Sequence, residues 1–164
     1  MRIKKSELRI EKFTLLGINI ICYTNDLEDN EVVELTNDEF NLDFDVFVKS
    51  EDERYFKIII RLVNYDKILP EAGYGIDVSG EFLFKFDNKE ELSEDKKQLL
   101  MSRSALPMAI AHIRSVIAST TSNFSLGSYY VPSIDLNHLF KAKRDSIEVE
   151  NEMEIEGDVP NSLL

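Results

Sequence analysis

Apolar residues occupy every second position in three segments of the first half of the chain. They are Phe40, Leu42, Phe44, Val46 and Val48, then Phe56, Ile58, Ile60 and Leu62, then Ile76, Val78, Phe82, Phe84 and Phe86. Because successive side chains of a strand point to opposite faces, each segment builds one apolar face. The pattern predicts strands over residues 40–48, 55–65 and 74–86.

The preceding segment, residues 8–23, also reads as a strand, but its alternation is irregular. The pattern slips between Ile10 and Phe13, where two charged residues stand side by side. An extra residue in one strand shifts the faces in this way, so we expect a β-bulge there. A polar loop over residues 25–37 then leads into the second strand.

Turn-forming residues at 49–54 join the second and third strands, which are therefore predicted to form a hairpin. Asp43 and Asp45 fall on the face opposite the alternating apolar residues, as do Lys57 and Arg61. In a hairpin these charges would lie near each other, where an opposite pair contributes roughly 0.2–1 kcal/mol.

From residue 99 to 117 the apolar residues change to helical spacing, which predicts a long amphipathic helix. Ser93 is a suitable N-cap, with two acids directly after it. Pro107 falls inside the pattern and removes a backbone hydrogen bond, so we expect a break near Ser104. Polar residues at 119–123 end the helix.

The segment after the long helix is more apolar than a solvated loop, and a short amphipathic helix is predicted to follow from Pro132. Strands first and helices after them indicate an α+β fold, in which a four-stranded antiparallel sheet is followed by one long helix and a short C-terminal helix. We expect a single domain over residues 1–145. Residues 146–164 are acidic and poor in aromatics, and they are predicted to form a disordered tail.

The composition fits this picture of one ordinary domain, because 164 residues can bury a core without disulfides or metals. The single cysteine, Cys22, cannot form an internal bridge, and it is predicted to be a buried, inert thiol. Without a signal peptide or disulfide framework, the sequence favours a cytoplasmic protein. No apolar run approaches the roughly 20 residues that span a bilayer, so membrane insertion is not expected.

The net charge of -12 argues against nucleic acid as a partner, because phosphate binding depends on Lys and Arg. The acids are concentrated: residues 13–48 and the chain after Arg144 contain no Lys or Arg. These two acidic zones could steer basic partners, and solubility is the alternative interpretation of the tail.

Catalytic signatures are missing from the sequence, which predicts a protein that is not an enzyme. His112 and His138 lie on different predicted elements; the first is interpreted as a packing residue and the second as solvent-facing. No cluster of ligands has metal-binding spacing, so neither a metal nor a cofactor is expected. Asp43 and Asp45 are paired carboxylates, but on a strand they are more simply part of a solvated face.

More apolar residues are present than one sheet with helices on one side can bury. Five apolar strand residues fall on the face away from the predicted core: Phe47, Tyr55, Ile59, Val63 and Leu83. A sheet of this kind cannot bury both faces by itself. The surplus predicts self-association, a groove for extended apolar segments, or both.

The last third of the chain resembles the protein-export chaperone family SecB. Leu106 and Pro107 fit the family's Leu-x-Pro or Phe-Pro step into a helix, and Arg114 fits the arginine of that helix. The segment Pro132–Phe140 fits the family's Pro-led start of the last helix, and residues 77–84 are similar to its fourth strand. The chain departs from the family pattern at Ser115 and at several loop positions, so the resemblance is to a divergent member.

The resemblance implies an ATP-independent holding chaperone. It implies a homotetramer, built as a dimer of dimers, that binds unfolded polypeptide in long apolar grooves. Groove-lining candidates are aromatic and leucine side chains, since these give large contact area: Phe47, Phe124, Leu126, Tyr129, Tyr130, Leu136 and Phe140.

The family also docks the SecA ATPase on the acidic face of its sheet. Asp77 stands at a position that resembles one of those acids, and Asp43 and Asp45 are added from charge alone. The alternative is a dedicated adaptor on the same scaffold that binds one partner, such as the antitoxin of a toxin–antitoxin–chaperone system.

Overall fold

The computed structural model describes residues 6–24, 40–48, 53–64, 72–87 and 92–157. The predicted loop at 25–37 lies outside them, as do residues 158–164. The contacts of the chain divide it into two units, residues 1–131 and 132–164, whereas the sequence placed the end of the domain at 145. Each unit is described by itself.

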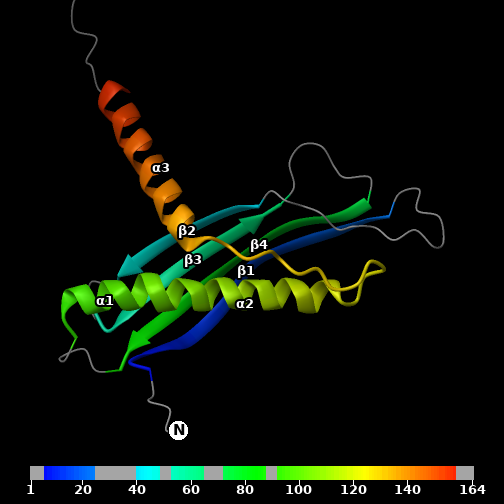
Figure 1. The fold of residues 1–164 in the computed structure, drawn as a ribbon, viewed down its shortest axis with the longest axis horizontal. Helices are drawn as coiled ribbons and strands as arrows, with labels where there is room; N and C mark the ends of the chain where they lie inside the picture. The colour runs from blue at the N-terminus through cyan, green and yellow to red at the C-terminus, as the bar shows by residue number, and fades with distance from the viewer. Residues whose placement is uncertain (1–5, 25–39, 49–52, 65–71, 88–91, 158–164) are drawn as a thin grey trace, which may run out of the picture. The chain divides into compact units, whose positions relative to one another are not determined.

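The first unit is a four-stranded antiparallel sheet with a helical layer on one face (Figure 1). The strands are β1 (Leu8–Thr24), β2 (Asn41–Val48), β3 (Tyr55–Val63) and β4 (Ala72–Phe86), and their order in the sheet is β1-β4-β3-β2. The predicted α+β class is therefore confirmed, and so is the hairpin of β2 and β3.

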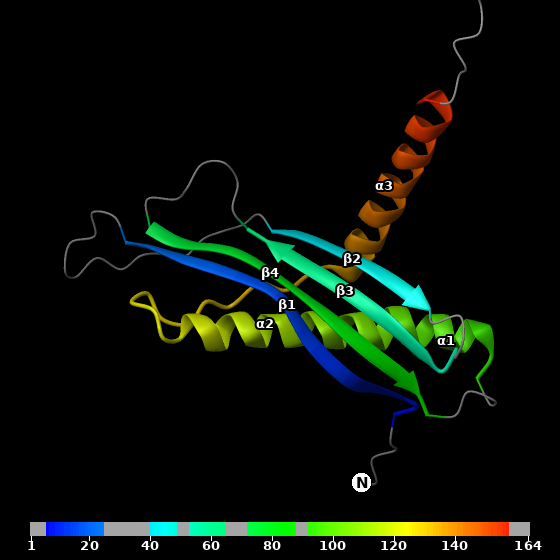
Figure 2. The ribbon, with the colours of Figure 1, turned by 180° about the vertical axis from the view of Figure 1, so that it is seen from behind.

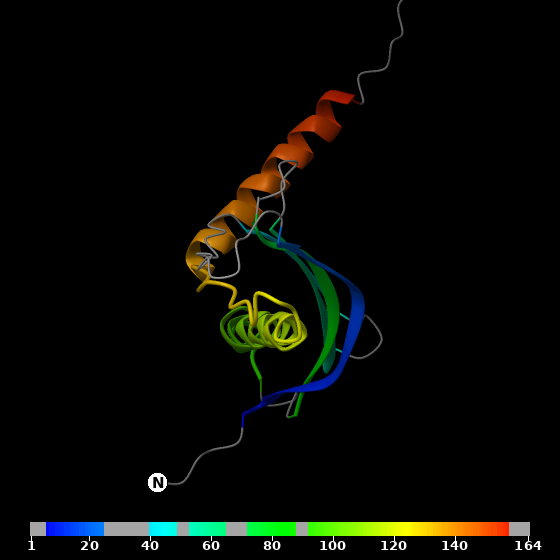
Figure 3. The same cartoon turned by 90° about the vertical axis from the view of Figure 1, so that its right-hand side faces the viewer.

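The core lies between the sheet and the helices. In register, Phe56 pairs with Phe84 and Ile58 with Phe82, so the alternating apolar residues of β3 and β4 share one face. The rings of Phe56 and Phe84 stack with their centroids 5.2 Å apart. Figure 3 shows the helices α1 (Glu94–Leu100) and α2 (Leu106–Thr121) end-on against this face of the sheet, and Figure 2 shows that neither helix crosses the opposite face.

Strand β1 contains two register shifts. The first, between Ile10 and Lys12, is the predicted bulge. The second lies between Leu15 and Gly17. Two leucines stand in succession there, so the alternation of apolar and polar positions does not reveal that the strand changes face. Each bulge bends the strand and increases its twist, which lets β1 curve along β4 (Figure 2).

The helical layer is formed by α1 (Glu94–Leu100), a π-helical segment η2 (Met101–Ala105) and α2 (Leu106–Thr121). The hydroxyl of Ser93 accepts a hydrogen bond from the Lys96 N–H, as expected of an N-cap. Pro107 lies in the first turn of α2. The helix widens before the proline, and Leu106 N–H donates to Met101 O, so the expected break is a π-bulge in a continuous helix.

The second unit contains α3 (Leu136–Gly157). Its first turn is capped by Asp135, whose carboxylate accepts hydrogen bonds from the backbone N–H groups of Asn137 and His138. The helix is longer than expected, because residues 146–157 are helical where the sequence predicted a disordered tail. None of the described helices is both long and apolar enough to span a membrane.

Candidate functional site

Strand β2 forms one edge of the sheet and carries an exposed apolar patch. Val46 is 42% exposed, Phe47 51% and Val48 57%. Val46 and Val48 pair with core residues of β3 and face the helical layer, whereas Phe47 pairs with Lys57 and faces away. An edge strand that exposes both apolar side chains and backbone hydrogen-bonding groups is a template for another extended chain. Val46, Phe47 and Val48 are called the β2 patch below.

The opposite edge of the sheet, β1, is also apolar. Four large side chains around its second bulge are exposed: Leu15, Leu16, Ile18 and Ile21. Leu15 and Ile18 pair with β4 on the helix-covered face, while Ile21 lies on the other face. The helices therefore leave apolar surface at both edges of the sheet.

The open face of the sheet is less apolar than the sequence suggested. Of the five predicted far-face residues, Phe47 is exposed, while Tyr55, Ile59, Val63 and Leu83 are half-buried. Long charged side chains provide part of this cover. The guanidinium of Arg54 and the ammonium of Lys85 lie 6.0 Å and 5.2 Å from the centre of the Tyr55 ring.

The predicted groove residues of the segment after α2 are not gathered on one surface. Tyr129 is 4% exposed, and its backbone N–H donates to the Thr121 hydroxyl at 2.7 Å. It belongs to the core, where its ring contacts Tyr74 edge-on. Tyr130, the next residue, is 76% exposed. Phe124 and Leu126 are half-buried, and Phe124 stacks on Tyr74.

Leu136 and Phe140, the last two groove candidates, lie four residues apart in the first turns of α3 and therefore share a side of that helix. They belong to the second unit. Among the groove candidates of the first unit, Phe47 and Tyr130 are the exposed ones.

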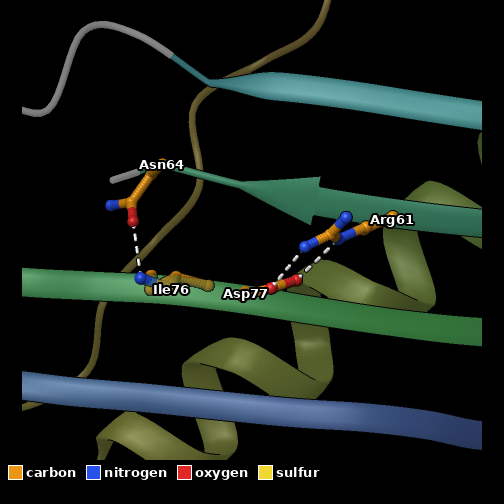
Figure 4. A network of polar contacts seen from close by, with 4 residues as sticks. All are labelled: Arg61, Asn64, Ile76 and Asp77. Atoms are coloured by element: carbon orange, nitrogen blue, oxygen red, sulfur yellow. Dashed lines mark hydrogen bonds and ion pairs between the residues drawn. The ribbon is translucent and has the colours of Figure 1, made fainter. Parts of the chain in front are cut away.

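The three acidic candidates lie on the open face, on β2 and β4. Asp43 and Asp45 are exposed on β2, and Asp43 is directly opposite Arg61 in register. Arg61 donates two hydrogen bonds to Asp77 on β4, at 2.9 and 2.7 Å (Figure 4). These bonds, more than the charge alone, hold the pKa of the Asp77 carboxyl below its usual value. Lys57 likewise binds Glu81 of β4 at 2.9 Å, so both bases that the sequence placed opposite β2 have acidic partners on β4.

The side chain of Asn64 continues the pairing of β3 and β4 beyond the last residue of β3 (Figure 4). Its amide oxygen accepts from Ile76 N–H at 2.6 Å, and its amide nitrogen donates to Tyr74 O at 2.9 Å. This clamp fixes the end of the sheet near Tyr74, whose hydroxyl donates to Gly127 O at 2.6 Å. Burial and the neighbouring Cys22 raise the pKa of Tyr74 to about 12. These contacts between distant residues gave no sequence signal.

A buried lysine is the second feature that the sequence did not indicate. Lys97 is among the buried residues, in the wall of a pocket of about 160 Å³ with Val48, Phe56 and Phe86. Its ammonium binds the carboxylate of Glu94, and this hydrogen bond raises the pKa of Lys97. Within the described residues no group of three His, Cys, Asp or Glu side chains could hold a metal ion.

Comparison with known proteins gives matches in structure only. No family model and no curated protein matches the chain. A SecB-like chaperone of Mycobacterium tuberculosis, solved with a peptide from an antitoxin, is 15% identical with a TM-score of 0.48; the match covers 79% of this chain and 88% of that one. A protein of unknown function from Streptococcus agalactiae is 12% identical with a TM-score of 0.47, over 77% of this chain and 98% of that one. At these low identities the similarity describes the fold of the chain, and it does not show what this protein binds.

Proposed function

We propose that this protein is an ATP-independent holding chaperone that binds unfolded or extended apolar polypeptide segments. The observation that carries the proposal is the β2 patch, where three consecutive apolar residues are exposed on an edge strand. The resemblance of Leu106, Pro107, Arg114 and the segment 132–140 to the SecB family supports it.

An extended segment beside β2 would gain two kinds of interaction. Its backbone would pair with the outer edge of the strand, and its alternate side chains would contact Phe47 on one face and Val46 and Val48 on the other. Burying apolar area contributes about 25 cal/mol per Å², and no chemical step or nucleotide is needed. The binding mode is therefore tolerant of sequence, which suits a holding chaperone.

The finer parts of the proposal concern assembly and partners. Apolar surface on β1 and on the helices, where Leu99 and Met108 are exposed, supports self-association, and we propose a homotetramer in the cytoplasm. Asp43 and Asp45 would provide a docking face for a basic partner such as SecA. Asp77 is the third acid of that face, and its carboxylate accepts two hydrogen bonds from Arg61.

The test is suppression of aggregation. A chemically unfolded, reduced client protein is diluted into buffer with and without this protein, and light scattering is recorded without ATP. We expect scattering to fall as the protein is added, and a soluble complex to elute in size-exclusion chromatography. Unchanged scattering at a several-fold molar excess would contradict the proposal.

A dedicated adaptor for one partner, such as an antitoxin, is the second candidate. It is favoured by the burial of Tyr129 and the half-burial of Phe124 and Leu126, which leave less open aromatic surface than a general groove would have. Tight binding of a single partner, with no effect on several unrelated unfolded clients, would select this candidate.

A further inference from the structure

A pocket of about 290 Å³ lies between α2 and the segment that follows it. Its lining includes three small side chains from successive turns of α2: Ala111, Ser115 and Ala118. Tyr130 and Val131 line it as well, and among the described lining residues Arg114 is the charged one. All of these residues belong to the first unit. Figure 1 shows the segment after α2 turning back along that helix.

The guanidinium of Arg114 is held in place from one side. Its Nε donates to the backbone carbonyl of Val131 at 3.0 Å, and the side chain is half-buried. Within the described part of the chain no other acceptor binds it. A guanidinium has five N–H donors, so the two terminal amino groups of Arg114 keep their donors for a ligand.

The chemistry of this pocket selects for an anion. The chain has 31 acids against 19 bases, yet none of the described residues that line the pocket beside Arg114 is an acid. An arginine presents two parallel donors that match a carboxylate, and one already oriented by another bond loses little side-chain entropy on binding. The small side chains of α2 leave room for an apolar group next to the charge.

From this geometry we infer that the pocket binds the carboxylate of an Asp or Glu side chain in an extended client segment. An apolar neighbour of that acid contacts Ala118 and the ring of Tyr130. The inference rests on the proposed function and adds a preference to it. Because the chain carries a net charge of -12, the preference applies to one acid at one place and not to acidic clients in general.

The test is a binding titration with two nonapeptides, both acetylated and amidated at their ends. One has a central glutamate flanked by leucine and tyrosine, and the other has glutamine in its place. We expect the wild-type protein to bind the glutamate peptide about tenfold more tightly at low salt, as a charge-assisted hydrogen bond does. Salt should reduce the preference, because the pocket is open to solvent.

Two charge-matched variants locate the effect. Arg114→Gln should abolish the preference for glutamate. Arg103→Gln changes the net charge equally at an exposed position outside the pocket lining, and it should keep the preference. A preference that survives in Arg114→Gln would overturn the inference.

A third variant separates binding from folding, because Arg114→Gln also removes the bond to Val131. Ala111 is exposed, so Ala111→Leu fills the pocket and leaves Arg114 in place. The variant should fold, as its circular dichroism melting curve would show, and it should lose the preference. A full preference in folded Ala111→Leu would contradict the pocket assignment.

The remaining outcomes distinguish this inference from the proposed function. Equal affinity of the wild type for both peptides would overturn the inference alone, whereas no binding of either peptide would overturn both. A third peptide has central glutamine and a free terminal carboxylate. If only this peptide gained affinity, the pocket would bind chain ends, and the assignment to a side chain would be wrong.

Discussion

Replacing Phe47 tests whether the β2 patch binds clients. Phe47→Thr removes the aromatic ring but keeps a β-branched residue with good strand propensity. Phe47 is half-exposed at the edge of the sheet and faces away from the helical layer, so the fold should lose little. We expect a weaker complex with an unfolded client and nearly unchanged unfolding.

The size of the effect follows from the exposed area. An aromatic side chain has roughly 200 Å² to bury, and Phe47 leaves 51% of its surface exposed. A client could therefore bury about 100 Å², which corresponds to about 2.5 kcal/mol at about 25 cal/mol per Å². Threonine retains some contact with the client, and the entropy lost when the client is ordered offsets part of the gain. We therefore expect Phe47→Thr to weaken the binding free energy by about 1–2 kcal/mol. The dissociation constant should rise about 5- to 30-fold.

The assay is fluorescence anisotropy of a labelled apolar peptide, with urea unfolding of each variant as a check on the fold. Ile147→Ala is the matched control, because Ile147 is 45% exposed but lies on α3 rather than β2. It should change the dissociation constant less than about twofold. Equal losses in the two variants would mean that exposed apolar area matters and its position does not. An unchanged affinity of folded Phe47→Thr would refute the role of the β2 patch.

Three further predictions concern stability. The pKa of Tyr74 is raised to about 12, so the folded state holds the phenolic proton more tightly than the unfolded chain does. This contribution to the free energy of unfolding is complete below about pH 10. It is lost as the pH rises to about 12, by up to roughly 2.7 kcal/mol. Urea unfolding at pH 8 and 11 should show about half of this loss, roughly 1.4 kcal/mol, and Tyr74→Phe should flatten it; an equal loss in both proteins would contradict the assignment. Gly80→Ala would place a Cβ 2.7 Å from Phe13, and overpacking should cost about 1–3 kcal/mol, whereas Gly17→Ala, whose Cβ would lie 3.2 Å from a serine hydroxyl, should cost less. Lys97→Met keeps the buried stem and removes the charge that pairs with the exposed Glu94, so the urea midpoint should stay nearly unchanged or rise; a clear fall in that midpoint would show that the ion pair is needed for folding.

The elements of the fold were predictable because local pattern and tertiary packing agree. The four strands match the predicted segments within a few residues, since apolar residues recur at alternate positions of β2, β3 and β4 on a sheet covered on one face. The predicted bulge at Ile10 had a visible cause in two adjacent charges. The bulge near Leu16 gives no such signal in the sequence, because apolar residues precede and follow the shift and the pattern looks unbroken.

The helices show where sequence patterns lose information. Pro107 indicated a disturbance near Ser104, and it occurs there, but sequence alone could not choose between a break and a π-bulge. Either one accommodates the proline, which has no N–H to donate to the preceding turn. The acidic composition of residues 146–157 indicated disorder, yet glutamate is a good helix former, and the cap at Asp135 starts a helix that runs through them.

The candidate site was less predictable than the fold, because composition reveals surplus apolar residues but not where each one goes. Tyr129 and Tyr130 are adjacent and chemically identical, and in sequence both fit a groove. The bond from Tyr129 N–H to the Thr121 hydroxyl fixes which of the two turns inward, and the packing of Tyr74 beneath the segment completes that choice. Tyr130 then faces solvent beside Arg114. Core packing thus decides which aromatic side chains this segment can offer to a client, so the binding surface follows from the fold and not from the number of aromatics.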